Sequence, residues 1–136
     1  MKKYLLLPLF LMSFLVQGQS LQGAWKLISQ NGKLVTEQEY IKIYQDDYFA
    51  FGVKNVADNA FIGAGGGPYK VEAGKCSETL DFFTLDPLQV GTTTPFKVEL
   101  KGNKLTLSAN TNGGMLVETW EKLSESKDDL TGNWVI

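Results

Sequence analysis

The chain has 136 residues, with 13 lysines and no arginine, 15 acidic side chains, one cysteine and no histidine. Without histidine, a Ser-His-Asp triad, a Cys-His nucleophile pair and an imidazole-based zinc site are excluded. A single cysteine forms neither an internal disulfide nor a cysteine cluster for a metal. The net charge of −2 and the lack of arginine argue against a nucleic-acid partner.

Residues 1–18 are typical of a signal peptide. Two lysines precede an apolar stretch of 13 residues from Tyr4 to Val16, which is shorter than the roughly 20 residues of a membrane span. We expect cleavage after Gly18, which leaves 118 residues with a net charge of −4. The sequence therefore predicts a secreted or periplasmic protein that does not span a membrane after cleavage, and an uncleaved N-terminal anchor is the alternative.

The rest of the chain predicts short strands separated by turns. Polar and apolar residues alternate along these segments, and glycine-containing turns stand between them. Only Thr36 to Glu39 has the composition of a short helix. Eight or more short strands indicate an antiparallel barrel or sandwich. The predicted strands are Leu21 to Ser29, Tyr40 to Tyr44, Tyr48 to Val53, Phe61 to Gly63, Tyr69 to Ala73, Cys76 to Phe83, Phe96 to Lys101, Lys104 to Ala109 and Leu116 to Leu123.

Four motifs in order favour the barrel. They are Gly-x-Trp at Gly23 and Trp25, Gly-Gly-Gly-x-Tyr at residues 65–69, Asp-Pro-x-x-Val-Gly at residues 86–91 and Glu-x-Trp-Glu at residues 118–121. The first resembles the opening of lipocalins and fatty-acid-binding proteins, the calycin superfamily, and the last strand resembles the closing strand of the fatty-acid-binding proteins. Together the four resemble a family of small secreted bacterial lipocalin-like domains. This implies an all-β, antiparallel up-and-down barrel of about 8 to 10 short strands over residues 19–123, and it transfers no established activity.

The Gly-x-Trp opening predicts a structural plug. Gly23 would let a neighbouring segment approach, and Trp25 would close one end of the barrel. In many lipocalins a basic residue of the last strand packs over this indole. The resemblance makes Lys122 the candidate here, because the chain has no arginine.

Strand alternation and the resemblance together suggest which residues face the interior. The closing strand of fatty-acid-binding proteins carries an inward cation that holds the ligand carboxylate, whereas Glu118 occupies the inward face here and disfavours a fatty acid. Alternation places Glu78 on one face of its strand, and an error of one residue would put both glutamates outside. Inward carboxylates beside aromatic rings suit a cationic or hydroxyl-rich apolar ligand. The candidate ligand-binding residues are Tyr69, Glu78, Phe82, Glu118 and Trp120.

The remaining motifs predict no cofactor and no metal. The glycine-rich stretch at residues 63–68 lacks the Lys-Ser/Thr that ends a phosphate-binding loop, and we expect it to form a bulge or kink. Cys76 is predicted to be a buried thiol. The acidic pairs at residues 46–47 and 128–129 lack the alternating spacing of a calcium loop.

Residues 124–136 contain a polar linker and then a second Gly-x-Trp pattern. Leu130 to Ile136 repeats the pattern of Leu21 to Leu27. This segment fits the start of a second repeat, or an extra strand that pairs with the barrel or with another chain. Because an exposed apolar strand with Trp134 favours association, residues 130–136 are a candidate homodimer contact.

Three functions fit these features. The first is a barrel that binds a small hydrophobic or amphipathic ligand. The second is a structural or protein-interaction module whose barrel is filled by its own side chains, since aromatic residues make up 12% of the chain. The third is a hydrolase that uses Glu78 and Glu118 as a carboxylate pair. A cavity of several hundred Å³ would favour the first over the second.

Overall fold

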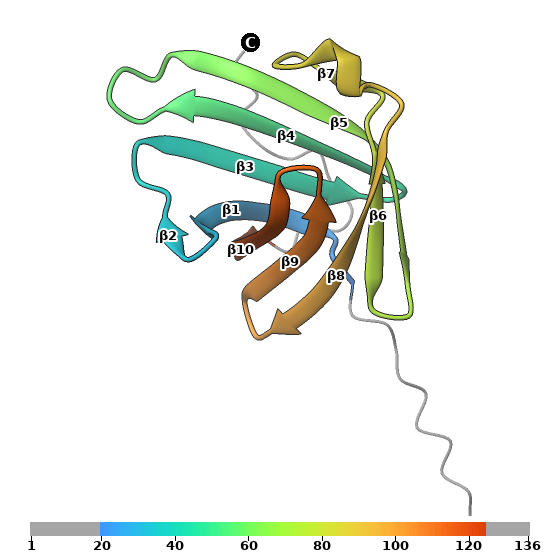
Figure 1. The fold of residues 1–136 in the computed structure, drawn as a ribbon. Helices are drawn as coiled ribbons and strands as arrows, with labels where there is room; N and C mark the ends of the chain where they lie inside the picture. The colour runs from blue at the N-terminus through green and yellow to red at the C-terminus, as the bar shows by residue number, and fades with distance from the viewer. Residues whose placement is uncertain (1–19, 125–136) are drawn as a thin grey trace, which may run out of the picture.

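Alternating polar and apolar residues build ten strands within residues 20–124, the part of the chain that the computed structural model describes (Figure 1). No α-helix occurs between these bounds, and one 3₁₀ turn, η1, spans Pro87–Gln89. The strands are β1 Gly23–Gln30, β2 Lys33–Leu34, β3 Gln38–Gln45, β4 Tyr48–Asn55, β5 Phe61–Glu72, β6 Lys75–Thr79, β7 Phe82–Phe83, β8 Thr93–Lys101, β9 Lys104–Thr111 and β10 Gly114–Ser124.

Eight of these strands close into a ring. Each of β1, β3, β4, β5, β6, β8, β9 and β10 is antiparallel to the next, and β10 returns to pair with β1. Two short strands lie outside the ring, with β2 paired to β1 and β7 paired to β5. The prediction of an antiparallel up-and-down barrel is confirmed.

The glycine-rich stretch lies inside a continuous strand. β5 runs through it without a register shift, and the irregularity between β4 and β5 lies at Val53 and Lys54. The expected bulge at residues 63–68 is therefore wrong. A Cβ at Gly65 would clash with the Phe51 ring, and one at Gly67 would clash with the Thr79 carbonyl. The glycines thus let the β6–β7 connection cross close over β5.

The predicted strand from Cys76 to Phe83 is broken in two. β6 ends at Thr79, and the next backbone amides bond elsewhere: Leu80 N–H donates to Thr92 O and Asp81 N–H donates to Gly66 O. This break changes the side-chain alternation before β7 begins. The predicted helix at Thr36 to Glu39 is also wrong, because β3 begins at Gln38.

Two predicted segments lie outside the described residues, namely the signal peptide at 1–18 and the repeated pattern at 130–136. β10 extends to Ser124, the last described residue. Within residues 20–124, no helix is long and apolar enough to cross a membrane.

Candidate functional site

The predicted structural plug surrounds Trp25, whose indole N–H has a hydrogen-bond partner. Trp25 is 0% exposed, and its indole N–H donates to Leu21 O at 2.8 Å. Lys122 Nζ of β10 lies 5.4 Å from the centre of the Trp25 ring. Gly23, at φ +123°, leaves room for the Ser124 carbonyl, which a Cβ would clash with. These four residues, Leu21, Gly23, Trp25 and Lys122, form what we call the Trp25 cluster.

A cavity of about 310 Å³ lies elsewhere inside the barrel. It reaches outward to Leu85, which is 51% exposed, and to the exposed Gln89 of η1. Most of its lining is apolar or aromatic, with a few charged groups at its inner surface. The lining includes Tyr40, Phe49, Phe51, Leu80, Phe83, Phe96, Leu116 and Trp120, together with Lys42, Glu78 and Glu118.

Lys42 and Glu78 form a buried ion pair on the cavity wall. Lys42 Nζ lies 2.9 Å from Glu78 Oε1 and 3.2 Å from Oε2. The Tyr44 hydroxyl donates a further hydrogen bond to Glu78 Oε1. Although burial opposes the charge of Lys42, the carboxylates of Glu78 and Glu118 outweigh it and raise the Lys42 pKa. The ammonium group is therefore held charged inside the barrel.

Aromatic rings surround the same ammonium group. Lys42 Nζ lies 4.7 Å from the centre of the Trp120 ring, 5.6 Å from Phe49 and 5.8 Å from Phe96. Such distances allow favourable cation–π contacts. The ammonium group of Lys42 thus occupies the aromatic part of the site, where Glu78 and the aromatic rings stabilise its charge.

Glu118 differs from Glu78 because no lysine among residues 20–124 forms an ion pair with it. It is 9% exposed, lines the cavity and has the neutral Trp120 N–H beside it. Burial raises its pKa, and Glu78 acts in the same direction, whereas Lys42 and the Trp120 N–H lower it. An acid with unused acceptor capacity therefore faces the cavity.

Trp120 has a buried polar atom without a hydrogen-bond partner among the described residues. Its side chain is 2% exposed, and its indole Nε1 is the one buried side-chain nitrogen or oxygen without a hydrogen-bond partner within residues 20–124. The N–H lies near enough to Glu118 to lower the pKa of that carboxyl, but not in hydrogen-bond geometry. Unsatisfied buried polar groups are rare and gather at functional sites.

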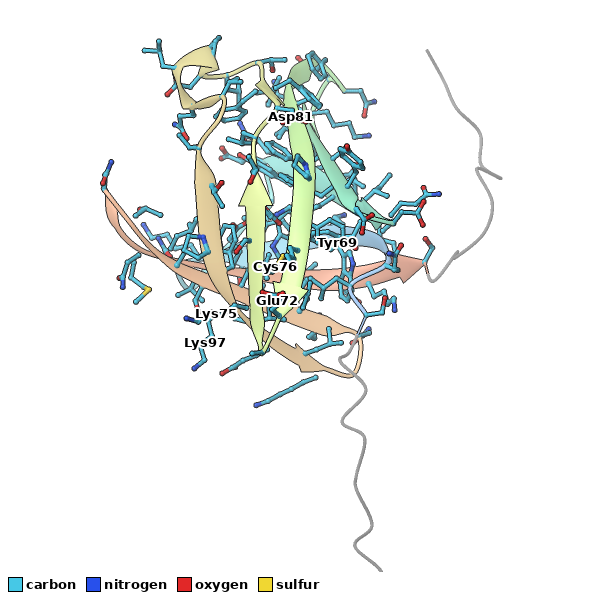
Figure 2. All side chains as sticks on the ribbon, turned by 90° about the vertical axis from the view of Figure 1, so that its right-hand side faces the viewer. Tyr69, Glu72, Lys75, Cys76, Asp81 and Lys97 are labelled. Atoms are coloured by element: carbon cyan, nitrogen blue, oxygen red, sulfur yellow. The ribbon has the colours of Figure 1, made fainter. Side chains whose placement is uncertain are left out.

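Three of the five predicted ligand-binding residues, Glu78, Glu118 and Trp120, line the cavity. The strand alternation that the sequence left open therefore points both glutamates inward. Tyr69 does not line it: its ring packs edge-on against Tyr44 at 4.7 Å, and its hydroxyl accepts from Gln22 Nε2 at 3.3 Å. Figure 2 shows Tyr69 beside Cys76 near the middle of the barrel, away from Asp81 at its end.

The prediction for Phe82 is wrong. Its side chain is 46% exposed on β7, and the neighbouring Phe83 lines the cavity instead. The cause is the break in the strand after Thr79, which exchanges the faces of the two phenylalanines.

Sequence reasoning also missed Lys42. A lysine between Ile41 and Ile43 is typical of a surface position, with the isoleucines inside, yet here both isoleucines are only half-buried and Lys42 is 4% exposed. The available signal was electrostatic. Two inward glutamates need a buried cation, and Lys42 stands between two tyrosines, Tyr40 and Tyr44, on the same strand face.

The described residues offer no metal or thiol chemistry. Between residues 20 and 124 there is no group of three or more acidic or cysteine side chains that could hold a metal ion. Cys76 is fully buried, and burial raises the pKa of its thiol to about 12.

Comparison with known proteins supports the fold and nothing finer. No protein-family model matches the chain, and no curated protein matches it. Among solved structures, the chain is similar to the crystal structure of an uncharacterized protein from Bacteroides eggerthii DSM 20697. The two are 20% identical with a TM-score of 0.50, over 74% of this chain and 98% of the other. At this identity the similarity concerns the barrel architecture alone.

Proposed function

We propose that the barrel binds a small amphipathic ligand in the cavity next to Glu118 and Trp120. The observation that carries the proposal is the cavity itself. Its volume of about 310 Å³ lies at the lower end of the range of small-molecule sites. Its lining combines many apolar and aromatic side chains with few polar groups, which is the usual composition of such sites.

This proposal is favoured over a barrel filled by its own side chains. In the Trp25 cluster, Leu21 and Trp25 are buried at 2% exposure or less, and the Trp25 indole N–H has a hydrogen-bond acceptor. The region around Glu118 is not packed in the same way, because it keeps a cavity, a buried indole N–H without a hydrogen-bond partner and a carboxyl without an ion-pair partner among residues 20–124. An interior that served stability alone would fill this space.

A carboxylate-pair hydrolase is less well supported. Both oxygens of Glu78 accept from Lys42, and Oε1 also accepts from Tyr44. Glu78 would have to give up these bonds to act as a nucleophile or base. We therefore assign the two glutamates to ligand recognition and electrostatic balance.

The signal-peptide pattern of residues 1–18 supports a proposal on location, and the resemblance of the four motifs supports one on family. We propose a secreted or periplasmic lipocalin-like protein, processed after Gly18. Intact mass measurement on the protein recovered from the cell exterior tests this point. A mass that retains residues 1–18 would contradict it.

Mass spectrometry under native conditions tests the binding proposal directly. We expect the purified protein to carry a small molecule that is released on denaturation. Leu116→Trp would fill the cavity and remove the adduct, because Leu116 lines it. Met115→Trp is the matched control, since Met115 is the preceding residue of β10 and is 57% exposed. Equal adducts in the two variants would contradict the proposal.

A further inference from the structure

The charges inside the barrel do not balance, and this imbalance identifies the ligand class. Resting on the proposed function, we infer that the ligand carries a protonated amine that pairs with Glu118, joined to a short apolar body. One cation and two carboxyl groups line the cavity, namely Lys42, Glu78 and Glu118. The Lys42 ammonium already pairs with Glu78.

The pairing of Lys42 with Glu78 is complete. The ammonium donates to both Glu78 oxygens at 2.9 and 3.2 Å and is otherwise surrounded by aromatic rings. The Tyr44 hydroxyl adds a third donor to the same carboxylate. Exchanging either partner for a ligand would be unfavourable, because breaking a buried ion pair leaves an uncompensated charge.

Glu118 is left as a buried carboxylate that needs a cation. It is more than nine-tenths buried, and the group that the protein places beside it is the neutral Trp120 N–H. The half-buried Lys122 lies over the Trp25 ring and does not line the cavity. Because buried charges are stable when paired, the cavity is complementary to a cation brought from outside.

Other ligand charges fit less well. An anionic head group would meet Glu118 with Lys42 already neutralised by Glu78, so the local field would repel it. A neutral alcohol would donate one hydrogen bond to Glu118 but would leave its charge unbalanced. A primary amine supplies several charge-assisted donors at once.

The pH dependence of binding follows from the groups that face Glu118. The ionisable ones are Lys42 and Tyr44 on β3 and Glu78 on β6, and the neutral Trp120 N–H lies beside the carboxyl on β10. Burial raises the pKa of Glu118, so this carboxyl takes up a proton at higher pH than an exposed glutamate. An ammonium ligand binds the ionised form, and we expect its affinity to rise as the pH increases through this pKa.

Three ligands with the same apolar chain test the inference: octylamine, octanol and octanoate. Calorimetric titration of the mature protein at neutral pH should show octylamine binding about tenfold more tightly than octanol, with octanoate the weakest. Glu118→Gln should abolish the preference for the amine and the rise of affinity with pH. Glu121→Gln is the matched control, because Glu121 lies on the same strand and pairs outside with Lys104 at 3.2 Å; it should retain both.

The outcomes separate the ligand class from the proposed function. Equal binding of octanol and octylamine, unchanged by Glu118→Gln, would overturn the amine and leave the binding barrel intact. Tight binding of octanoate would do the same. If none of the three binds and Leu116→Trp changes nothing, both the binding proposal and the amine are wrong. A flat pH profile for octylamine in the unmodified protein would argue against Glu118 even if the glutamine variant did not fold.

Discussion

The barrel contains two tryptophan–lysine pairs that differ in how well their polar atoms are satisfied. Trp25 lies under Lys122 at 5.4 Å and donates its N–H to Leu21 O. Trp120 lies under Lys42 at 4.7 Å, but its N–H has no partner among residues 20–124 and a cavity adjoins it. The same residue types therefore form a hydrogen-bonded, packed cluster in one region and border a cavity in the other.

The difference lies in the hydrogen bonds rather than in burial. Both indoles are at most 2% exposed, so exposure alone does not distinguish them. What distinguishes them is that the Trp25 N–H has a hydrogen-bond acceptor, whereas the Trp120 N–H has none of good geometry among residues 20–124. Variants at the two pairs test this contrast.

The largest effect is expected from Trp25→Ala. Removing a fully buried indole should lower the free energy of unfolding by about 3 to 5 kcal/mol. Trp120→Phe keeps one aromatic ring, removes the pyrrole half of a buried indole and breaks no hydrogen bond of good geometry, so it should cost less, about 1 to 2 kcal/mol. Urea denaturation of both variants measures the contrast. If Trp25→Ala unfolds at the same urea concentration as the parent, Trp25 is not the structural plug.

Exchanging the two lysines for methionine should give the next contrast. Lys42→Met leaves Glu78 and Glu118 buried without a cation and should cost roughly 3 kcal/mol at neutral pH. Lys122→Met affects a partly buried cation over Trp25 and should cost about 1 kcal/mol or less. Urea denaturation of the two variants measures both losses in the free energy of unfolding. Similar losses in the two variants would show that the cations have the same role.

Glu118→Gln should increase stability in the absence of ligand, by on the order of 1 kcal/mol at neutral pH. Because the pKa of Glu118 is raised in the folded state, its favourable contribution is complete below the unfolded pKa and is lost as the pH rises through the folded pKa. The gain from glutamine should therefore vanish near pH 4 and grow toward pH 7. Thermal unfolding across this range checks the sign, and a gain independent of pH would contradict it.

The smallest effect concerns Cys76, which lies on β6 two residues before Glu78. Full burial, with a pKa raised to about 12, should suppress reaction with thiol reagents in the native protein. We expect labelling only on opening of the barrel, at a rate that falls further when a ligand occupies the cavity. Fast labelling of the folded protein would show that the barrel opens readily at β6.

Alternation and turn residues predicted the antiparallel strands because these signals are local, and the resemblance of the four motifs favoured a barrel over a sandwich. The sequence placed Glu78 and Glu118 as a pair, but strand alternation alone does not decide between inside and outside. Phe82 was misplaced because the backbone leaves β6 at Leu80 to bond with Thr92, and this long-range contact has no local signature. Lys42 was missed for a similar reason, since its partner Glu78 is distant in the sequence.

The pairing of β1 with β10 also determines when the cavity next to Glu118 forms during folding. Ala24 pairs with Ser124, so the ring closes through residues from opposite ends of the barrel sequence, and such closure is slow. Glu118 and Trp120 arrive with this last strand. During synthesis, the wall that holds Lys42 and Glu78 is therefore an open sheet in water, and we expect the chain to acquire any ligand only after its final strand has docked.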